Sequence, residues 1–79
     1  MKVYKTKDFY LSALLYVNDF KLIDSEFDGI NTVYFIFEND NEDKLGSLLT
    51  EFINKTANVN LKKYVYATSV IRSELNKYR

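Results

Sequence analysis

The sequence contains no cysteine, no histidine and no proline, and each absence narrows the kind of protein it can encode. Without cysteine the chain has no disulfide bond and no thiolate nucleophile, and without histidine it has no imidazole base. Together these two absences remove every ordinary zinc or iron site. The serines therefore lack the usual activating base. We expect that the protein is not an enzyme, and that it has no catalytic residue, no metal and no cofactor.

Glycine is also scarce, because Gly29 and Gly46 are the only two. Two isolated glycines cannot form a phosphate-binding loop, and without proline the element ends must be marked by Asn, Asp and Thr. No apolar stretch approaches the roughly 20 residues that a membrane helix needs, and no charged segment followed by an apolar run opens the chain. These absences predict a cytoplasmic protein without a membrane partner.

Hydrophobic material is plentiful, since 47% of the 79 residues are hydrophobic and 16% are aromatic. This length corresponds to one domain, residues 1–79, whose hydrophobic core can be stable without disulfide bonds or a structural metal. Hydrophobic periodicity predicts an α+β fold in the order α-β-β-α-α, with a β-hairpin packed on helices. The predicted elements are a helix at residues 7–17 capped by Thr6, strands at Phe20–Phe27 and Ile30–Glu38, a helix starting within residues 39–43, a last helix after the cap Asn60, and, as an addition that the pattern allows, a short strand at Met1–Lys5.

Apolar residues spaced three and four apart mark one face of each of the two C-terminal helices. This spacing predicts stripes that pack on the core, and the stripes include Ile53 in the first of these helices and Leu61 in the second. The seam of the last helix is also compatible with a short coiled coil.

The dipeptide Asp28-Gly29 between the two predicted strands is a strong hairpin signal. We expect a two-residue turn there, with the pairs Phe20–Phe37, Leu22–Phe35 and Asp24–Val33. Period-two geometry then places Ser25, Tyr34 and Ile36 on the outer face of the hairpin, away from the helices. That outer face is therefore not cleanly polar.

The first predicted helix is apolar on almost every side, and the outer hairpin face is half apolar. Together they present more apolar surface than a small monomer normally buries. We therefore predict a homo-oligomer, or a partner that covers the remainder, with Leu15, Tyr34 and Ile36 in the interface.

Charge is distributed unevenly although the net charge is zero, because residues 19–51 contain nine acidic and only two basic side chains. Turns and a helix start explain part of this bias, since acids are favoured there. The segment that begins at Asp24 resembles the start of a calcium loop, but Phe35 stands where a bidentate Glu is needed. The remaining interpretation is an acidic surface that meets basic grooves, formed by Asp24, Glu26, Asp28, Glu38, Asp40, Glu42 and Asp43.

The last 28 residues have the opposite bias, with six basic side chains against one acid. A basic face with an outward tyrosine on the last helix can contact phosphates and stack a base. An ordinary solvated, lysine-rich helix face explains the same pattern. The candidate nucleic-acid-binding residues are Lys62, Lys63, Tyr66, Lys77 and Arg79.

Three blocks of sequence stand out: Tyr4–Leu11 (YKTKDFYL), Val33–Glu38 (VYFIFE) and Val59–Tyr64 (VNLKKY). In these blocks the chain resembles a group of short domains of uncharacterised function found in phages, prophages and Firmicute-type bacteria. The resemblance spans nearly the whole chain. It implies a phage or mobile-element origin and action in the cytoplasm of a bacterial host, but it supplies no catalytic residue.

Three functional hypotheses follow. The first is a non-enzymatic phage-type binding protein that occupies a host protein or nucleoprotein complex through its acidic surface, as an anti-defence (anti-CRISPR-like) inhibitor. The second is a small nucleic-acid-binding or transcription-modulating protein that uses the basic last helix. The third is a small-molecule sponge that traps a nucleotide signal in an aromatic pocket at an oligomer interface.

Overall fold

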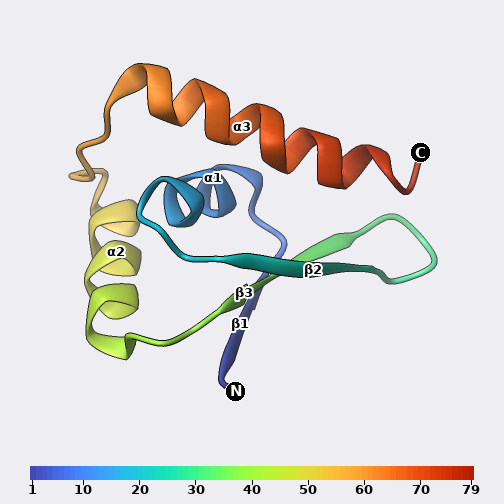
Figure 1. Ribbon diagram of the computed structural model, residues 1–79, viewed down its shortest axis with the longest axis horizontal. Coiled ribbons are helices and arrows are strands. Elements are labelled where there is room, and N and C mark those ends of the chain that lie inside the picture. Colours follow the sequence, from blue (N-terminus) through green and yellow to red (C-terminus); the bar gives the residue numbers. More distant parts are fainter.

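The computed structural model describes residues 1–79 and consists of a three-stranded antiparallel sheet with helices on one of its faces (Figure 1). The elements are β1 (Val3–Thr6), α1 (Phe9–Val17), β2 (Leu22–Phe27), β3 (Val33–Glu38), α2 (Glu42–Asn54) and α3 (Leu61–Asn76). The predicted α+β class is confirmed. The N-terminal strand is present and pairs with β3, so that the sheet order is β1-β3-β2. None of the three helices is long and apolar enough to cross a membrane.

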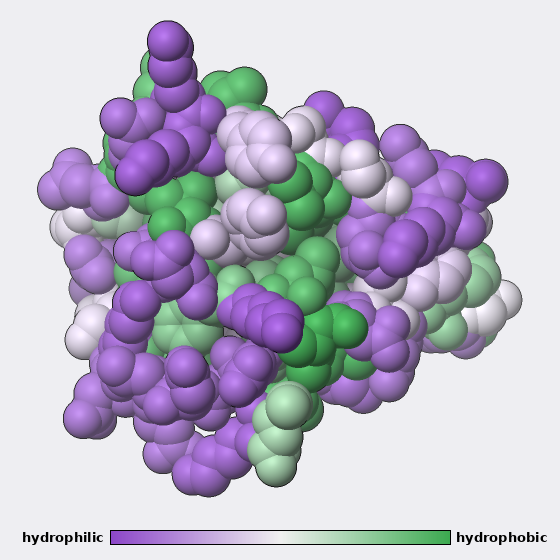
Figure 2. Space-filling model, viewed as in Figure 1, coloured by the Kyte–Doolittle hydropathy of each residue, from purple (hydrophilic) through white to green (hydrophobic).

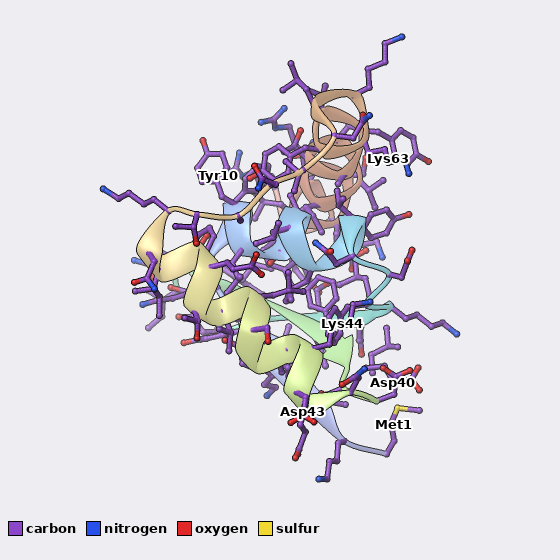
Figure 3. The ribbon with its side chains drawn as sticks, turned by 90° about the vertical axis from the view of Figure 1, so that its left-hand side faces the viewer. Met1, Tyr10, Asp40, Asp43, Lys44 and Lys63 are labelled. Atoms are coloured by element: carbon purple, nitrogen blue, oxygen red, sulfur yellow. The ribbon has the colours of Figure 1, made fainter.

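Helix α1 lies between α3 and the sheet in both ribbon views (Figures 1 and 3). All five residues from Leu11 to Leu15 are buried, and the four apolar ones share a core cluster with Phe35 and Phe37 of β3 and Ile71 of α3. This enclosure explains why almost every side of α1 is apolar. Leu15 has no exposed surface, so its predicted place in an oligomer interface is wrong.

Helix α1 begins after Asp8 rather than after Thr6. Thr6 ends β1, where it lies opposite Phe35, and this pairing requires an extended backbone that delays the helix. The Asp8 carboxylate accepts a hydrogen bond from the Leu11 backbone N–H at 2.9 Å, while the Thr6 hydroxyl accepts one from the Asp8 N–H at 3.1 Å. The predicted Thr6 cap is therefore wrong, and Asp8 has that role.

The connection between β2 and β3 is a five-residue loop, Asp28–Thr32, and not the predicted two-residue turn. The Asp28 carboxylate accepts hydrogen bonds from the backbone N–H groups of Ile30, Asn31 and Thr32, at 2.8, 3.0 and 3.1 Å. Gly29 has a φ angle of 87°, a conformation that costs glycine little. In this wider loop one side chain satisfies three backbone donors that the strands do not pair, and this stabilises the loop.

The pairing of β2 with β3 also differs from the prediction. Leu22 lies opposite Phe37, Asp24 opposite Ile36, and Ser25 opposite Phe35, with a register shift between Leu22 and Asp24. All three predicted pairs are therefore wrong. Because the irregularity reverses the alternation of side chains, Ser25 faces the helices and is only 6% exposed.

The sheet face opposite the helices, called here the outer sheet face, consists of Val3, Lys5, Asp24, Glu26, Tyr34, Ile36 and Glu38. Lys5 of β1 reaches Glu26 of β2 across the central strand, with an N–O distance of 2.9 Å. Ile36 is only 7% exposed and Tyr34 is half-buried within the single chain. The chain thus covers most of the apolar surface that motivated the prediction of a homo-oligomer.

The two C-terminal helices pack as amphipathic elements. In α2 the stripe residues Leu45 and Leu48 are buried, and in α3 Ile71 is fully buried. Two predicted stripe residues are instead exposed, Ile53 at 74% and Leu61 at 75%. Both border the connection between α2 and α3, which lies at the edge of the molecule (Figure 1).

Helix α3 begins at the predicted cap. The Asn60 side chain accepts a hydrogen bond from the Lys63 backbone N–H at 3.1 Å, as expected for an Asn that precedes a helix. This cap fixes the direction of the first turn of α3, which contains Lys62 and Lys63, both exposed.

Candidate functional site

The seven predicted acidic residues occupy three separate parts of the structure. Asp24, Glu26 and Glu38 lie on the outer sheet face, and Asp28 lies in the loop between β2 and β3. Asp40, Glu42 and Asp43 gather where α2 begins, and Figure 3 shows Asp40 and Asp43 at that end of the helix. The seven acidic residues therefore do not form one continuous surface.

Asp28 is engaged by its own loop. The hydrogen bonds from the Thr32 and Ile30 backbone N–H groups hold the pKa of the Asp28 carboxyl below its ordinary value. The ionised form is thus stabilised by local structure. Asp28 therefore stabilises its own loop.

Two other carboxylates have lysine partners from the N-terminal segment. Glu42 pairs with Lys2 at 2.7 Å, and Glu26 pairs with Lys5 at 2.9 Å. The hydrogen bond from the Lys2 ammonium lowers the pKa of Glu42. Exposed pairs of this kind contribute little to stability, but they neutralise part of the acidic charge.

A shallow groove of about 660 Å³ runs along the solvent side of α2 and is lined only by polar residues and glycine. The lining residues are Glu42, Asp43, Gly46, Ser47, Thr50 and Glu51. Sequence reasoning missed Glu51, although it lies eight residues after Asp43, close to two helical turns and therefore on the same side. Asp40, Glu42, Asp43 and Glu51 are called here the α2 acidic face.

The lysine within α2 does not neutralise this face. The Lys44 ammonium lies 5.2 Å from the centre of the Phe20 ring and donates a hydrogen bond to the Asn18 carbonyl. It is therefore directed toward the end of α1. Only Glu42 in the α2 acidic face has a basic partner.

The five predicted nucleic-acid-binding residues are divided between the two ends of α3. Lys62 and Lys77 are separated by 15 residues, about 22 Å along a helix axis. Lys77 pairs with Glu74 of the preceding turn at 2.9 Å, and Arg79 follows it at the end of the chain. Only Lys62, Lys63 and Tyr66 lie together.

These three residues line a cleft with the end of α1, called here the α1–α3 cleft. Its other lining residues are Tyr16, Val17 and Asp19, and its volume is about 360 Å³. Lys63 lies on the opposite side of α3 from Tyr10, as the labels in Figure 3 show. The side of the molecule in Figure 2 has hydrophobic side chains visible in its middle, between polar ones.

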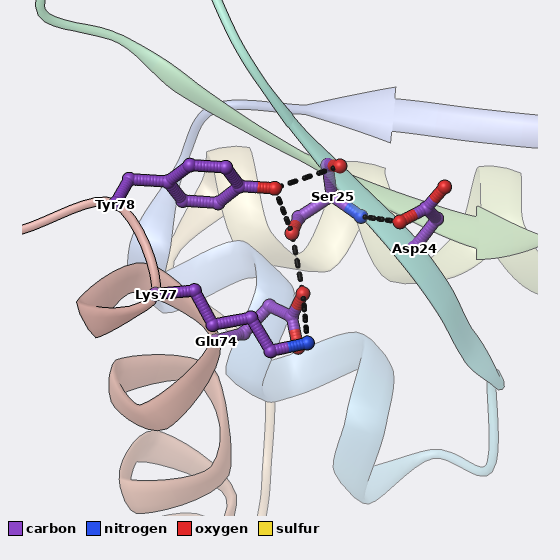
Figure 4. A network of polar contacts seen from close by, with 5 residues as sticks. All are labelled: Asp24, Ser25, Glu74, Lys77 and Tyr78. Carbon is purple, nitrogen blue, oxygen red and sulfur yellow. Dashed lines mark hydrogen bonds and ion pairs between the residues drawn. The ribbon is translucent and has the colours of Figure 1, made fainter.

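A polar network connects the C-terminal end of α3 to β2 (Figure 4). The Ser25 hydroxyl donates to the Glu74 carboxylate, and the Tyr78 hydroxyl donates to the Ser25 carbonyl at 2.9 Å. The Tyr78 and Ser25 hydroxyl oxygens are 2.8 Å apart. Because each hydroxyl has one proton, Tyr78 is the donor in this contact too and shares its proton between the two Ser25 oxygens.

The electrostatics of this network indicate a structural role, in which it holds the end of α3 against β2. Burial acts to raise the pKa of Glu74, but hydrogen bonds from Ser25 and Lys77 outweigh it and hold that pKa below its ordinary value. An ionised carboxylate of lowered pKa is a weak base, and Ser25 is 6% exposed, so a substrate cannot reach its hydroxyl. Sequence reasoning missed the network because its members are about 50 residues apart and no local pattern connects them.

Comparison with known proteins identifies one relationship. A family model described as "Domain of unknown function (DUF5659)" matches residues 1–77, nearly the whole chain. This match agrees with the resemblance to an uncharacterised family. No curated protein and no solved structure matches the chain.

Proposed function

The chain belongs to the DUF5659 family, and we propose that it is a non-enzymatic binding protein whose α2 acidic face occupies a basic groove of a host macromolecule. The observation that carries the proposal is the gathering of Glu42, Asp43 and Glu51 on the solvent side of α2, with Asp40 just before the helix begins; of these four, only Glu42 has a basic partner. A groove lined by carboxylates with no apolar residue suits a charged partner rather than an apolar ligand.

The spacing of these carboxylates supports a basic partner. Asp43 and Glu51 are eight residues apart, about 12 Å along the helix, so the negative charges form a row rather than a point. A row of negative charge attracts positively charged grooves and accelerates encounter, and salt weakens the effect. Grooves of that charge are common where a protein holds nucleic acid.

The anti-defence role is the specific form of this proposal. The partner would then be a host defence protein or nucleoprotein complex whose nucleic-acid groove the α2 acidic face fills. The resemblance to phage and prophage domains supports this form, and the acidic face supplies its mechanism, namely imitation of nucleic-acid charge.

A charge-neutralising triple variant, Asp40→Asn, Asp43→Asn and Glu51→Gln, tests the proposal and leaves the Lys2–Glu42 pair intact. The matched control neutralises three carboxylates of the outer sheet face, Asp24→Asn, Glu26→Gln and Glu38→Gln. Tagged proteins are used to capture partners from a bacterial host lysate at low and high salt. We expect a basic partner that wild type and control retain at low salt, and that the α2 variant loses.

Two results would contradict this proposal. In the first, the wild type enriches no host protein. In the second, the α2 variant retains the partner as well as the control does, which would show that the α2 acidic face is not the contact.

One observation favours the nucleic-acid hypothesis: Lys62, Lys63 and Tyr66 line the same cleft. The pairing of Lys77 with Glu74 and its distance from the other two lysines weaken it. Electrophoretic mobility of single- and double-stranded nucleic acid at low salt tests it, since a phosphate-binding face must shift at least one of them.

A further inference from the structure

We propose that the α1–α3 cleft is a binding site for a nucleoside monophosphate, held within a single chain. Its volume of about 360 Å³ falls in the range of roughly 300–1,000 Å³ that small-ligand pockets occupy. The proposal is independent of the α2 acidic face, because no residue lines both the groove and the cleft.

The cleft combines groups that recognise different parts of such a ligand. Its cations are Lys62 and Lys63, its aromatic rings belong to Tyr16 and Tyr66, and its acid is Asp19. The smaller cavity of about 170 Å³, between α1, α2, the first turn of α3 and the connection that precedes it, has no charged lining residue. The groove on α2 has no hydrophobic or aromatic lining residue. The α1–α3 cleft is therefore the hollow whose chemistry matches a ligand with both a ring and an anion.

Lys62 and Lys63 are available to a phosphate. The three salt bridges of the structure involve Lys2, Lys5 and Lys77, so neither cleft lysine has an acidic partner. Both also lie in the first turn of α3, where the helix dipole disfavours a cation and favours an anion. A bound phosphate would compensate both lysines.

Tyr16 and Tyr66 supply the surface for a base. Tyr16 is half-buried at the end of α1 and so is held in place, whereas Tyr66 is 64% exposed and free to adjust to a ligand. Aromatic side chains stack on nucleobases irrespective of base identity. A ring adjacent to two lysines therefore suits a nucleotide better than it suits inorganic phosphate.

Asp19 contributes to the selectivity of the site. Its carboxylate lines the same cleft and has no basic partner. A carboxylate repels additional phosphates, which favours a monophosphate over a triphosphate or a polynucleotide chain. It also accepts hydrogen bonds from an amino group, and this favours a base such as adenine.

Binding is measured by isothermal titration calorimetry with adenosine monophosphate, adenosine, inorganic phosphate, purine riboside monophosphate and a single-stranded deoxyadenosine oligonucleotide as probes. Amide chemical shifts of the ¹⁵N-labelled protein locate the site. We expect adenosine monophosphate to bind about tenfold more tightly than either adenosine or phosphate, because each of these lacks one half of the recognition. The shifted amides should lie in residues 16–19 and 62–66.

The variants have matched controls. Tyr66→Ala should weaken adenosine monophosphate binding about tenfold, while Tyr10→Ala, which removes an equally exposed tyrosine (62%) on the opposite side of α3, should leave it unchanged. Lys63→Ala should weaken it about tenfold, while Lys7→Ala should not. Asp19→Gly removes the acceptor and should abolish the preference for adenosine monophosphate over purine riboside monophosphate. Glycine tolerates the left-handed backbone of residue 19, where φ is 68°.

Each remaining outcome overturns the proposal. Equal affinity for phosphate and adenosine monophosphate would show that the tyrosines do not participate. Binding of the oligonucleotide without binding of the mononucleotide would assign the cleft to nucleic acid. Amide shifts outside the cleft, or no heat and no shifts with any probe at millimolar concentration, would remove the site altogether.

Discussion

Removal of one hydroxyl, by Ser25→Ala, tests the polar network between β2 and α3. Ser25 is buried, and its hydroxyl donates to the Glu74 carboxylate, whose side chain is only 15% exposed. A hydrogen bond to a charged group contributes about 1.5–3 kcal/mol, and water screens this one weakly. The Tyr78 hydroxyl keeps its second partner, the Ser25 carbonyl at 2.9 Å. We therefore expect a loss of about 2 kcal/mol in the free energy of unfolding.

Thermal and urea unfolding followed by circular dichroism measure this loss. In a domain of this size, 1 kcal/mol corresponds to about 4–8 °C in Tm, so Ser25→Ala should lower Tm by about 8–16 °C. The control is Ser73→Ala on the exposed side of α3, which should be neutral or slightly stabilising because Ala is the better helix former. A loss below about 0.5 kcal/mol for Ser25→Ala would refute the reasoning, since even a neutral hydrogen bond contributes about that much.

The pH dependence provides a second check of the same network. The pKa of Glu74 is lowered in the folded protein, so its contribution to stability is fully present above the unfolded pKa, near 4.5. The contribution is lost as pH falls through the lower folded pKa. The stability difference between wild type and Ser25→Ala should therefore be constant near neutral pH and shrink below about pH 4.5. A difference that stays constant down to pH 2 would contradict the role of the ionised Glu74.

Three further predictions concern the loop, α2 and the state of assembly. Asp28→Ala should lower Tm, because three backbone N–H groups lose their acceptor, whereas Asp28→Asn should retain most of the stability; thermal unfolding of both variants distinguishes loop capping from mere charge. Gly46→Ala should raise the free energy of unfolding by about 1 kcal/mol, because nothing lies within 4 Å of the added Cβ and Ala favours the helix; urea unfolding that shows a loss would mean that α2 is distorted there. Light scattering at high micromolar concentration should give the mass of one chain, because the chain itself buries Leu15 and Ile36; a stable dimer would support the sequence-based prediction of a homo-oligomer.

The parts of the fold that depend on near neighbours in the sequence could be predicted. The stripe of α2 depends on spacings of three and four, and the cap Asn60 depends on an N–H group three residues later. The candidate site was partly predictable for the same reason. Lys62, Lys63 and Tyr66 share one helical segment and do line one cleft, whereas the distant Lys77 pairs elsewhere.

The sequence by itself determined the type and order of the helices and strands, which residues carry charge, and that no cysteine or histidine chemistry is available. The tertiary structure alone decided which surfaces remain free. Enclosure of α1 by the sheet and α3 buried Leu15, and the register shift in β2 turned Ser25 toward Glu74. The end of α1 placed Tyr16 and Asp19 beside Lys62. Local propensity acts over a few residues, but burial and pairing depend on elements far apart in the chain, so only the packed molecule decides them.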